Sequence, residues 1–241
     1  MMIRTVVLHY HLFKNAGTSL DQMLRAHLGD AWITEEFSMA GDNNTAQVAD
    51  WIADNPEALA FSSHTMVGPL PEVDGVEIIP VILLRNPLAR IASAYRFERK
   101  QEADTWGAEL AKEHDLEGYV RARLARPNDR QCRNFQVARL ATLRPGPGRE
   151  LFRANAGLNM LQGHGVVGRV EHFDAFRSAL LTRLAPAFPD FDPPAARANT
   201  TRADSQQISL DLAALLTEHN TDDIALLAQV NALLGLSAHL D

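Results

Sequence analysis

The residues of this sequence best placed to do chemistry lie close to its start, in the segment Lys14-Asn15-Ala16-Gly17-Thr18-Ser19. An apolar run precedes the segment and an amphipathic pattern follows it, which predicts a strand, a turn and a helix in succession. The first backbone N–H groups of such a helix have no partner within it and carry the positive end of its dipole. Gly17 lets a ligand approach the backbone, and Lys14, Thr18 and Ser19 add side-chain donors. The segment is therefore predicted to bind an oxyanion.

This segment differs from the Walker A loop of nucleoside-triphosphate-binding proteins, which reads G-x-x-x-x-G-K-[ST]. Thr18 stands where that loop has its lysine, and the lysine of this chain lies three residues before Gly17. His11 stands near the place of the first glycine. A lysine at the front of the loop reaches a different atom of the ligand, so ATP is not the ligand that the sequence favours.

A second segment with chemical potential begins at Arg85, directly after an apolar run typical of a parallel strand that helices cover on both faces. Asn86 can cap a helix and Pro87 fits the first turn of one. In an open α/β sheet, ligands bind in the crevice beyond the carboxyl ends of the strands. A guanidinium there can donate two parallel hydrogen bonds to a phosphate, which predicts that Arg85, with Ser93 two turns into the helix, binds one.

Together the two segments resemble the sulfotransferases that use 3′-phosphoadenosine 5′-phosphosulfate (PAPS), in particular the carbohydrate branch that contains the heparan and chondroitin enzymes, sulfotransferase family 2. The stretch His11–Ser19 is similar to the 5′-phosphosulfate loop of that family, H-x-P-K-x-A-G-T-S, with Phe13 in place of the proline. The stretch Arg85–Tyr95 is similar to the 3′-phosphate motif, R-D-P-x-x-R-x-x-S-x-Y, with Asn86 in place of the aspartate. Asn and Asp cap helices comparably, so little loss is expected from that change.

The resemblance is strong over residues 3–95 and continues more weakly to residue 202. Phe61-Ser62-Ser63-His64 resembles the family's second strand, whose end carries a histidine that acts as catalytic base in some members. Residues 133–140 are similar to an N-x-Q-x-x-R-x-L helix of the family, and residues 166–173 to a later strand-to-helix step. Asn199-Thr200-Thr201-Arg202 looks like the loop near the phosphate and adenine of the cofactor.

The resemblance implies PAPS as cofactor and adenosine 3′,5′-bisphosphate as product. In-line transfer of the sulfuryl group then assigns Lys14 to the leaving phosphate oxygen and His64 to the base that takes the acceptor proton, with His11 as the alternative base. The 5′-phosphosulfate is expected on the loop, and the 3′-phosphate on Arg85 and Ser93. The predicted cofactor-binding residues are Lys14, Asn15, Ala16, Gly17, Thr18, Ser19, Arg85, Ser93 and Arg202. No metal is expected, because no cluster of ligands at metal-binding spacing is evident.

The resemblance suggests a hydroxyl of a carbohydrate or small glycoconjugate as acceptor, but no sequence motif names the sugar. The basic run Arg96–Lys100 could attract an anionic glycan or lie on a solvated helix face. The roles of Arg90 and Arg139 stay open. Two alternatives also stay open: a P-loop kinase acting on a small molecule, and a non-catalytic nucleotide-binding protein that keeps the pocket without a base.

The bulk properties agree with one enzyme domain spanning residues 1–241. A chain of 241 residues that is 46% hydrophobic can bury one sizeable core. A net charge of −7 argues against nucleic acid as a partner, and Cys132, the one cysteine, fits a small buried residue better than a nucleophile. No stretch approaches the roughly 20 apolar residues of a membrane span and no signal peptide is recognised, so a bacterial, cytoplasmic protein is expected. The oligomeric state is open.

The hydrophobic patterns predict an α/β protein with a P-loop-like three-layer fold: a central parallel sheet, flanking helices and a helical, substrate-facing insertion over residues 97–160. Strands are predicted at residues 3–9, 58–63, 78–84 and 165–170. Helices are predicted at residues 17–28, 45–54, 87–101, 107–126, 130–144, 172–185, 209–219 and 221–234.

Overall fold

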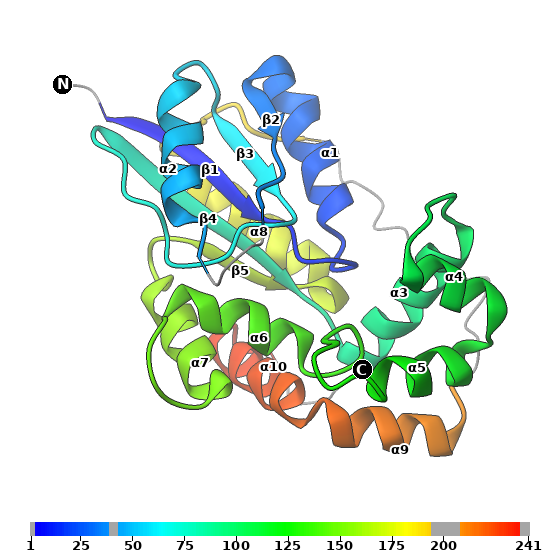
Figure 1. Ribbon diagram of the computed structural model, residues 1–241. Helices are drawn as coiled ribbons and strands as arrows, with labels where there is room; N and C mark the ends of the chain where they lie inside the picture. The colour runs from blue at the N-terminus through cyan, green and yellow to red at the C-terminus, as the bar shows by residue number, and fades with distance from the viewer. Residues whose placement is uncertain (1–2, 39–42, 194–207, 237–241) are drawn as a thin grey trace.

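A computed structural model describes residues 3–38, 43–193 and 208–236 of the chain. One sheet of five parallel strands, in the order β2-β3-β1-β4-β5, lies at the centre of the molecule (Figure 1). The strands are β1 (Arg4–Tyr10), β2 (Trp32–Thr34), β3 (Ala60–Ser63), β4 (Val76–Leu84) and β5 (Val166–Arg169). The predicted α/β class with a central parallel sheet is confirmed.

Helices cover both faces of the sheet, and further helices lie beyond the carboxyl ends of its strands. In the described residues they are α1 (Gly17–Leu28), α2 (Thr45–Asp54), α3 (Pro87–Lys100), α4 (Trp106–Glu113), α5 (Leu116–Leu124), α6 (Phe135–Leu140), α7 (Glu150–Met160), α8 (Phe173–Leu184), α9 (Leu210–His219) and α10 (Thr221–Leu233). None of them combines the length and apolar character needed to cross a bilayer.

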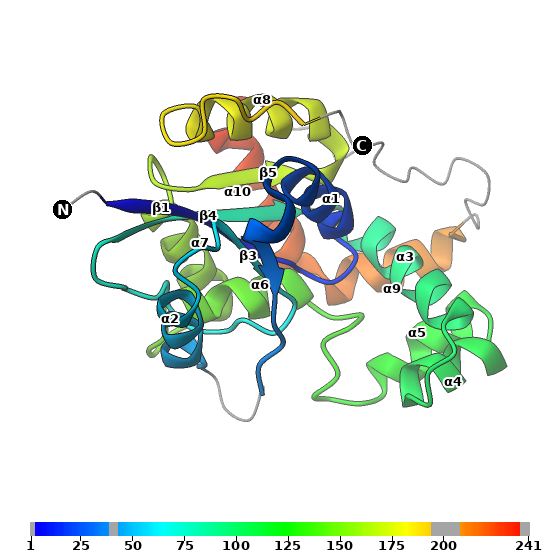
Figure 2. The same cartoon turned by 90° about the horizontal axis from the view of Figure 1, so that it is seen from above.

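The alternation of side chains along β1 explains the three layers. Val6 and Leu8 face one side, where they pack against α2, α6, α7 and α10, whereas Val7 faces the other side and packs against α1 and α8. Figure 2, which looks at the sheet from above, shows α1 and α8 on one side and α2, α6 and α7 on the other. Both faces of the sheet are therefore buried, as the continuous apolar runs of β1 and β4 require.

A third apolar core lies outside these layers, among α3, α4, α5 and α9. Ile91 and Tyr95 of α3 pack there against Leu110 of α4, Tyr119 of α5 and Leu216 of α9. Because only two residues separate the end of β4 from the start of α3, this helical lobe stands next to the carboxyl ends of the strands (Figure 1).

The loop that follows β1 occupies the topological switch point of the sheet. After β1 the chain forms β2 and β3 on one side of β1, and it then crosses to form β4 and β5 on the other side. The strand order therefore reverses at β1, which makes the carboxyl end of β1 the switch point. In register, Tyr10 at the end of β1 lies beside Ser63 of β3 and Ile82 of β4. His11, His64 and Arg85 each stand at or just beyond this edge, which is where the fold class places its ligands.

Four features differ from the elements that the sequence predicts. The single helix predicted over residues 107–126 is two helices, because Asp115 caps the start of α5 by accepting a hydrogen bond from the Gly118 N–H at 2.8 Å. The helix predicted over residues 130–144 is shorter, because α6 begins at Phe135 and ends at Leu140. Strand β2 and helix α7 were not predicted. Of the helices within residues 97–160, α4 and α5 pack in the third core, away from the sheet. Helices α6 and α7 instead pack on the sheet, through the core that includes Val137 and Leu158. The predicted insertion is therefore wrong for its second half.

Candidate functional site

The loop after β1 has the backbone of an anion-binding site. Lys14 (φ 64°) and Ala16 (φ 57°) adopt left-handed conformations that cost about 1 kcal/mol each for residues with a Cβ. The N–H groups of Ser19 and Leu20 bond to the carbonyl of Ala16. The N–H groups of Ala16, Gly17 and Thr18 have no acceptor among the described residues. Three adjacent donors are thus available to a ligand at the N-terminus of α1.

Gly17 is required at its position because the ring of His11 fills the space next to it. A Cβ at residue 17 would lie 2.1 Å from Cδ2 and 2.3 Å from Nε2 of His11. The imidazole of His11 therefore packs directly against the loop, and it is only 7% exposed.

The predicted site residues surround one pocket of about 380 Å³, a volume within the range of ligand sites. The predicted residues on its wall are His11, Lys14, Ala16, Gly17, Thr18, Ser19, His64, Arg85 and Ser93. Phe13, Arg96, Phe97 and Val170 complete the wall. Arg202 lies outside the described residues. The structure thus brings together residues from the ends of β1, β3 and β4 and from α3.

Three cations in this pocket lack a carboxylate partner. None of the ion pairs in the described part of the chain involves Lys14, Arg85 or Arg96. Burial lowers the pKa of Lys14, and the positive charges of Arg85 and Arg96 lower it further. The Lys14 ammonium lies 4.4 Å from the ring centre of Phe97, a cation–π contact. An anion bound here would relieve the repulsion among the three cations.

Gln136 of α6 holds the two halves of the pocket together. Its side chain is fully buried, donates to the carbonyl of Arg85 at 2.8 Å, and accepts from the Arg85 N–H and from the Asn15 amide, both at 2.9 Å. Asn15 also donates to the carbonyl of Leu83, so both hydrogens of its NH2 group are used within the protein, and the residue lies off the pocket wall. Arg85 in turn donates to the carbonyl of Lys14 at 3.0 Å.

The helix that begins after Arg85 is capped as predicted: the Asn86 side chain accepts from the N–H groups of Leu88 and Ala89. Ser93 lies on the pocket wall, whereas Arg90 is buried elsewhere, with its guanidinium 4.4 Å from the ring centre of Phe135. Arg90 is therefore part of the packing between α3 and α6.

His64 stands at the pocket with a carboxylate behind it. Its Nδ1 lies 2.6 Å from Oε1 of Glu36, and both side chains are half exposed. Its ring centre lies 3.9 Å from that of His11. Arg139 of α6 donates to the carbonyls of His64, at 2.7 Å, and Met66, at 3.0 Å, which fixes the backbone that follows β3.

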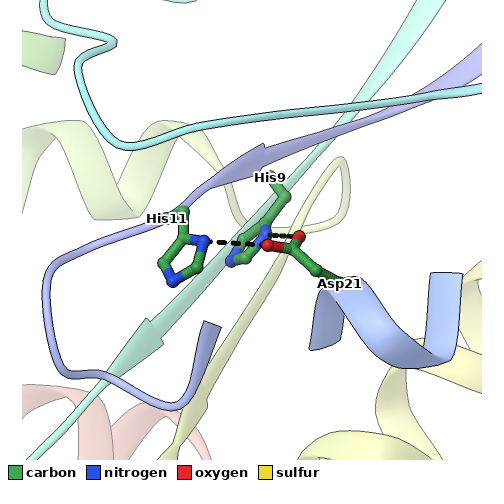
Figure 3. Close-up of side chains that lie close together, drawn as sticks. All are labelled: His9, His11 and Asp21. Carbon is green, nitrogen blue, oxygen red and sulfur yellow. Dashed lines mark hydrogen bonds and ion pairs between the residues drawn. The ribbon is translucent and has the colours of Figure 1, made fainter. Parts of the chain in front are cut away.

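A second carboxylate, Asp21 of α1, stands between two buried histidines (Figure 3). Oδ1 lies 2.8 Å from Nδ1 of His9 and accepts from the Ser62 hydroxyl at 2.6 Å, and Oδ2 lies 2.9 Å from Nδ1 of His11. Burial alone would raise the pKa of Asp21, but the contacts with His11 and His9 outweigh it and hold that pKa well below its usual range. The atoms of His9, His11 and Asp21 that could bind a metal ion lie within 4.8 Å of one another, a grouping that sequence spacing did not reveal. Nδ1 of each histidine faces one oxygen of the Asp21 carboxylate.

The sequence analysis missed Glu36 and Asp21 and gave no role to Gln136. It considered Arg96 and Phe97 only as part of a basic run, whereas both lie on the pocket wall. Arg96 and Phe97 had a usable signal, because they lie three and four residues after Ser93 on a helix and so share its face. Cys132 is 1% exposed, and burial raises its pKa to about 12, which fits the packing role predicted for it.

Comparison with models of known protein families finds no match. The chain is 33% identical, over 237 residues, to a protein of Archaeoglobus fulgidus that is described only as uncharacterized. The aligned region covers 95% of this chain and 93% of the archaeal one, so the likeness includes the sheet, the pocket and the helical lobe. The chain therefore belongs to the same family as this archaeal protein.

Proposed function

We propose that the protein is a sulfotransferase that moves the sulfuryl group of PAPS to an acceptor hydroxyl, with a carbohydrate or small glycoconjugate as acceptor. The observation that carries the proposal is a single pocket with two sets of anion-binding groups. Unpaired N–H groups, Lys14, Thr18 and Ser19 form one set at the end of β1, and Arg85 and Ser93 form the other at the start of α3. Two anionic groups on one small ligand match this arrangement.

The reaction needs groups that hold the donor in line with the acceptor and receive charge on the leaving oxygen. The N–H groups of residues 16–18 and the hydroxyls of Thr18 and Ser19 hold the 5′-phosphosulfate. Lys14 receives the negative charge that grows on the phosphate oxygen as its bond to sulfur breaks. His64 takes the proton of the attacking hydroxyl, which an imidazole can do near neutral pH.

A P-loop kinase is the second candidate, because a strand, a phosphate loop and a helix at a switch point are also what such an enzyme uses. Kinases hold Mg²⁺ on carboxylates and phosphate oxygens. No Asp or Glu is found among the described residues that line the pocket. This lining favours a ligand whose charge is met by cations alone. We propose further that this sulfotransferase has a P-loop-like fold and acts in the cytoplasm.

Calorimetric titration tests the cofactor with adenosine 3′,5′-bisphosphate, ATP and ADP as probes. We expect micromolar binding of the bisphosphate, weaker binding of ATP, and at least a tenfold loss of bisphosphate affinity in Arg85→Ala, since a charge-assisted hydrogen bond is removed. Arg121→Ala, on the outer side of α5, serves as the matched control and should bind as the wild type does. Preference for ATP, or an Arg85→Ala variant that binds normally, would overturn the proposal in favour of the kinase or of another ligand.

A further inference from the structure

The segment after β2 brings a carboxylate to His64 that no motif indicated. Oε1 of Glu36 lies 2.6 Å from Nδ1 of His64 and 3.3 Å from its backbone N–H. Oε2 accepts from the Thr65 hydroxyl at 2.8 Å and lies 3.4 Å from that of Ser63. Four donors on two oxygens give the carboxylate one orientation.

This contact determines which ring nitrogen of His64 can act as a base. A carboxylate only accepts hydrogen bonds, so Nδ1 carries the hydrogen and Nε2 keeps its lone pair. Nε2 has no hydrogen-bond partner among the described residues. Burial alone would raise the pKa of Glu36, but the hydrogen bonds from His64 and Thr65 outweigh it and hold that pKa below its usual value, so the acceptor stays ionised at neutral pH.

Two other charged or titratable groups contact His64. The His11 ring lies tilted against it, with ring centres 3.9 Å apart and with Asp21 on the far side of His11, and Arg139 donates to the His64 carbonyl. Burial lowers the pKa of His11, which therefore stays neutral near pH 7 and does not repel a proton on His64. Arg139 bears its charge near Glu36 and fixes the backbone of the strand end.

We propose that Glu36 is the positioning residue of the site, that it presents Nε2 of His64 to the acceptor hydroxyl, and that His64 and not His11 is the base. As the acceptor oxygen bonds to sulfur, its O–H bond breaks and the proton passes to Nε2. The bond between sulfur and the 5′-phosphate oxygen breaks, and its electron pair stays on the phosphate beside Lys14. Glu36 remains ionised and stabilises the imidazolium, which afterwards releases its proton to water.

The first experiment reads the tautomer directly and needs no acceptor. Long-range proton–nitrogen correlation spectra of histidine-labelled protein, with His64→Asn to identify the ring, should show the Nδ1–H tautomer of His64 in the wild type. Glu36→Ala should shift the ring toward the Nε2–H tautomer, whereas Glu35→Ala, at the exposed neighbouring residue, should leave it unchanged. An Nε2–H tautomer in the wild type, or no change in Glu36→Ala, would overturn the inference.

The second experiment measures sulfuryl transfer, and here the inference rests on the proposed function. Glu36→Gln keeps an acceptor but loses the charge, so kcat should fall about tenfold with the KM for PAPS unchanged, and the acidic limb of the rate–pH profile should move to lower pH. Glu35→Gln should match the wild type. A loss of rate with an unmoved limb would assign Glu36 a structural role only. If the wild type transfers no sulfuryl group, the proposed function fails, while the tautomer spectra still decide the role of Glu36.

Discussion

At the scale of single residues, Lys14 combines an unusual backbone conformation with an unusual electrostatic environment. Its backbone is left-handed, its ammonium lies on the face of Phe97, and two guanidinium groups lower its pKa beyond what burial does. No ion pair in the described part of the chain involves this lysine, and no carboxylate is found among the described residues of the pocket wall. Under the proposed function, its charge is available to the negative charge that develops on the leaving oxygen.

Replacing Lys14 by Ala should consequently affect turnover more than binding. We expect sulfuryl transfer to fall about 10²–10³-fold, as it does when a donor to a developing oxyanion is removed, while affinity for adenosine 3′,5′-bisphosphate falls less than tenfold. Lys112→Ala, on an exposed face of α4, is the control. Steady-state kinetics and calorimetry on the same preparations make the comparison. Equal losses in the two measurements would mean that Lys14 binds the ground state only.

His11 gives a residue-scale prediction that is independent of any ligand. Its pKa is lowered in the folded protein, mainly by burial, so the unfolded chain binds the proton more tightly. The free energy of unfolding should therefore decrease as the pH falls below about 6.5, the ordinary value for histidine, and the loss should end at the lower folded pKa.

Denaturant titrations between about pH 7.5 and 5.5 measure this slope. His11→Asn should reduce it, and His164→Asn, at an exposed turn, should not. A variant at residue 11 with the full wild-type slope would show that another group carries the proton linkage. Asp21 acts in a lower window: because its folded pKa is depressed, its contribution is present above about pH 3.9 and is lost as the pH falls further.

At the scale of elements, α6 braces the pocket, in that its side chains bond to segments that follow three different strands. Gln136 ties the loop after β1 to the end of β4, and Arg139 ties the end of β3 to the same helix. Leucine in place of Gln136 would leave the partly buried N–H and carbonyl of Arg85 without partners, at a cost of about 1 kcal/mol for each group. Denaturant unfolding should show this loss, with Gln47→Leu, on the exposed face of α2, as the control. A loss no larger than that of the control would exclude the bracing role.

The same scale shows what sequence could and could not predict. The bounds predicted for α1 and α2 match the structure because both helices have apolar residues at a clear helical spacing and caps or breaks at their ends. Strand β2 has only three residues at the edge of the sheet, too few for a periodic signal. The break between α4 and α5 depends on one aspartate cap inside an otherwise continuous apolar pattern.

For the site, the sequence predicted residues near the ends of strands and the start of a helix. Lys14 and Arg85 were predicted from their place between a strand and the helix that follows it, and His11 and His64 from the family resemblance. Glu36 was not predicted: it lies 28 residues from His64 in the chain and meets it only because β2 and β3 are neighbours in the sheet. No local pattern encodes such a pairing, and the same is true of Gln136, which stands 51 residues from Arg85.

At the scale of the whole molecule, the pocket lies between two separately packed bodies, namely the sheet with its two cores and the helical lobe with the third core. The loop after β1 belongs to the sheet and its two cores, whereas Ser93, Arg96 and Phe97 come from α3, whose apolar face packs in the helical lobe. A ligand that contacts both sides links them. By mass action, adenosine 3′,5′-bisphosphate at about 100 times its Kd should raise the free energy of unfolding by about 2.7 kcal/mol.

Amide hydrogen exchange can show which helices the bound ligand stabilises. We expect slower amide exchange in both α1 and α3 when the bisphosphate is bound, and weaker protection of both helices in Arg85→Ala at the same ligand concentration, because its lower affinity reduces the stabilisation. Protection confined to one of the two helices would place the ligand on one body alone and would contradict a site shared between them.

The charge of the pocket has a consequence for how ligands arrive. The protein as a whole carries a net charge of −7, yet the pocket wall has three cations and no carboxylate in its described part. Beyond roughly 8–10 Å, the Debye length at physiological salt, a ligand senses little of this contrast, and closer in it senses mainly the pocket. A small anion that fits inside the pocket is attracted by its cations, whereas a long polyanion also feels the negative net charge of the rest of the protein. We therefore expect the protein to bind short anions in preference to long polyanions, and added salt should weaken that preference.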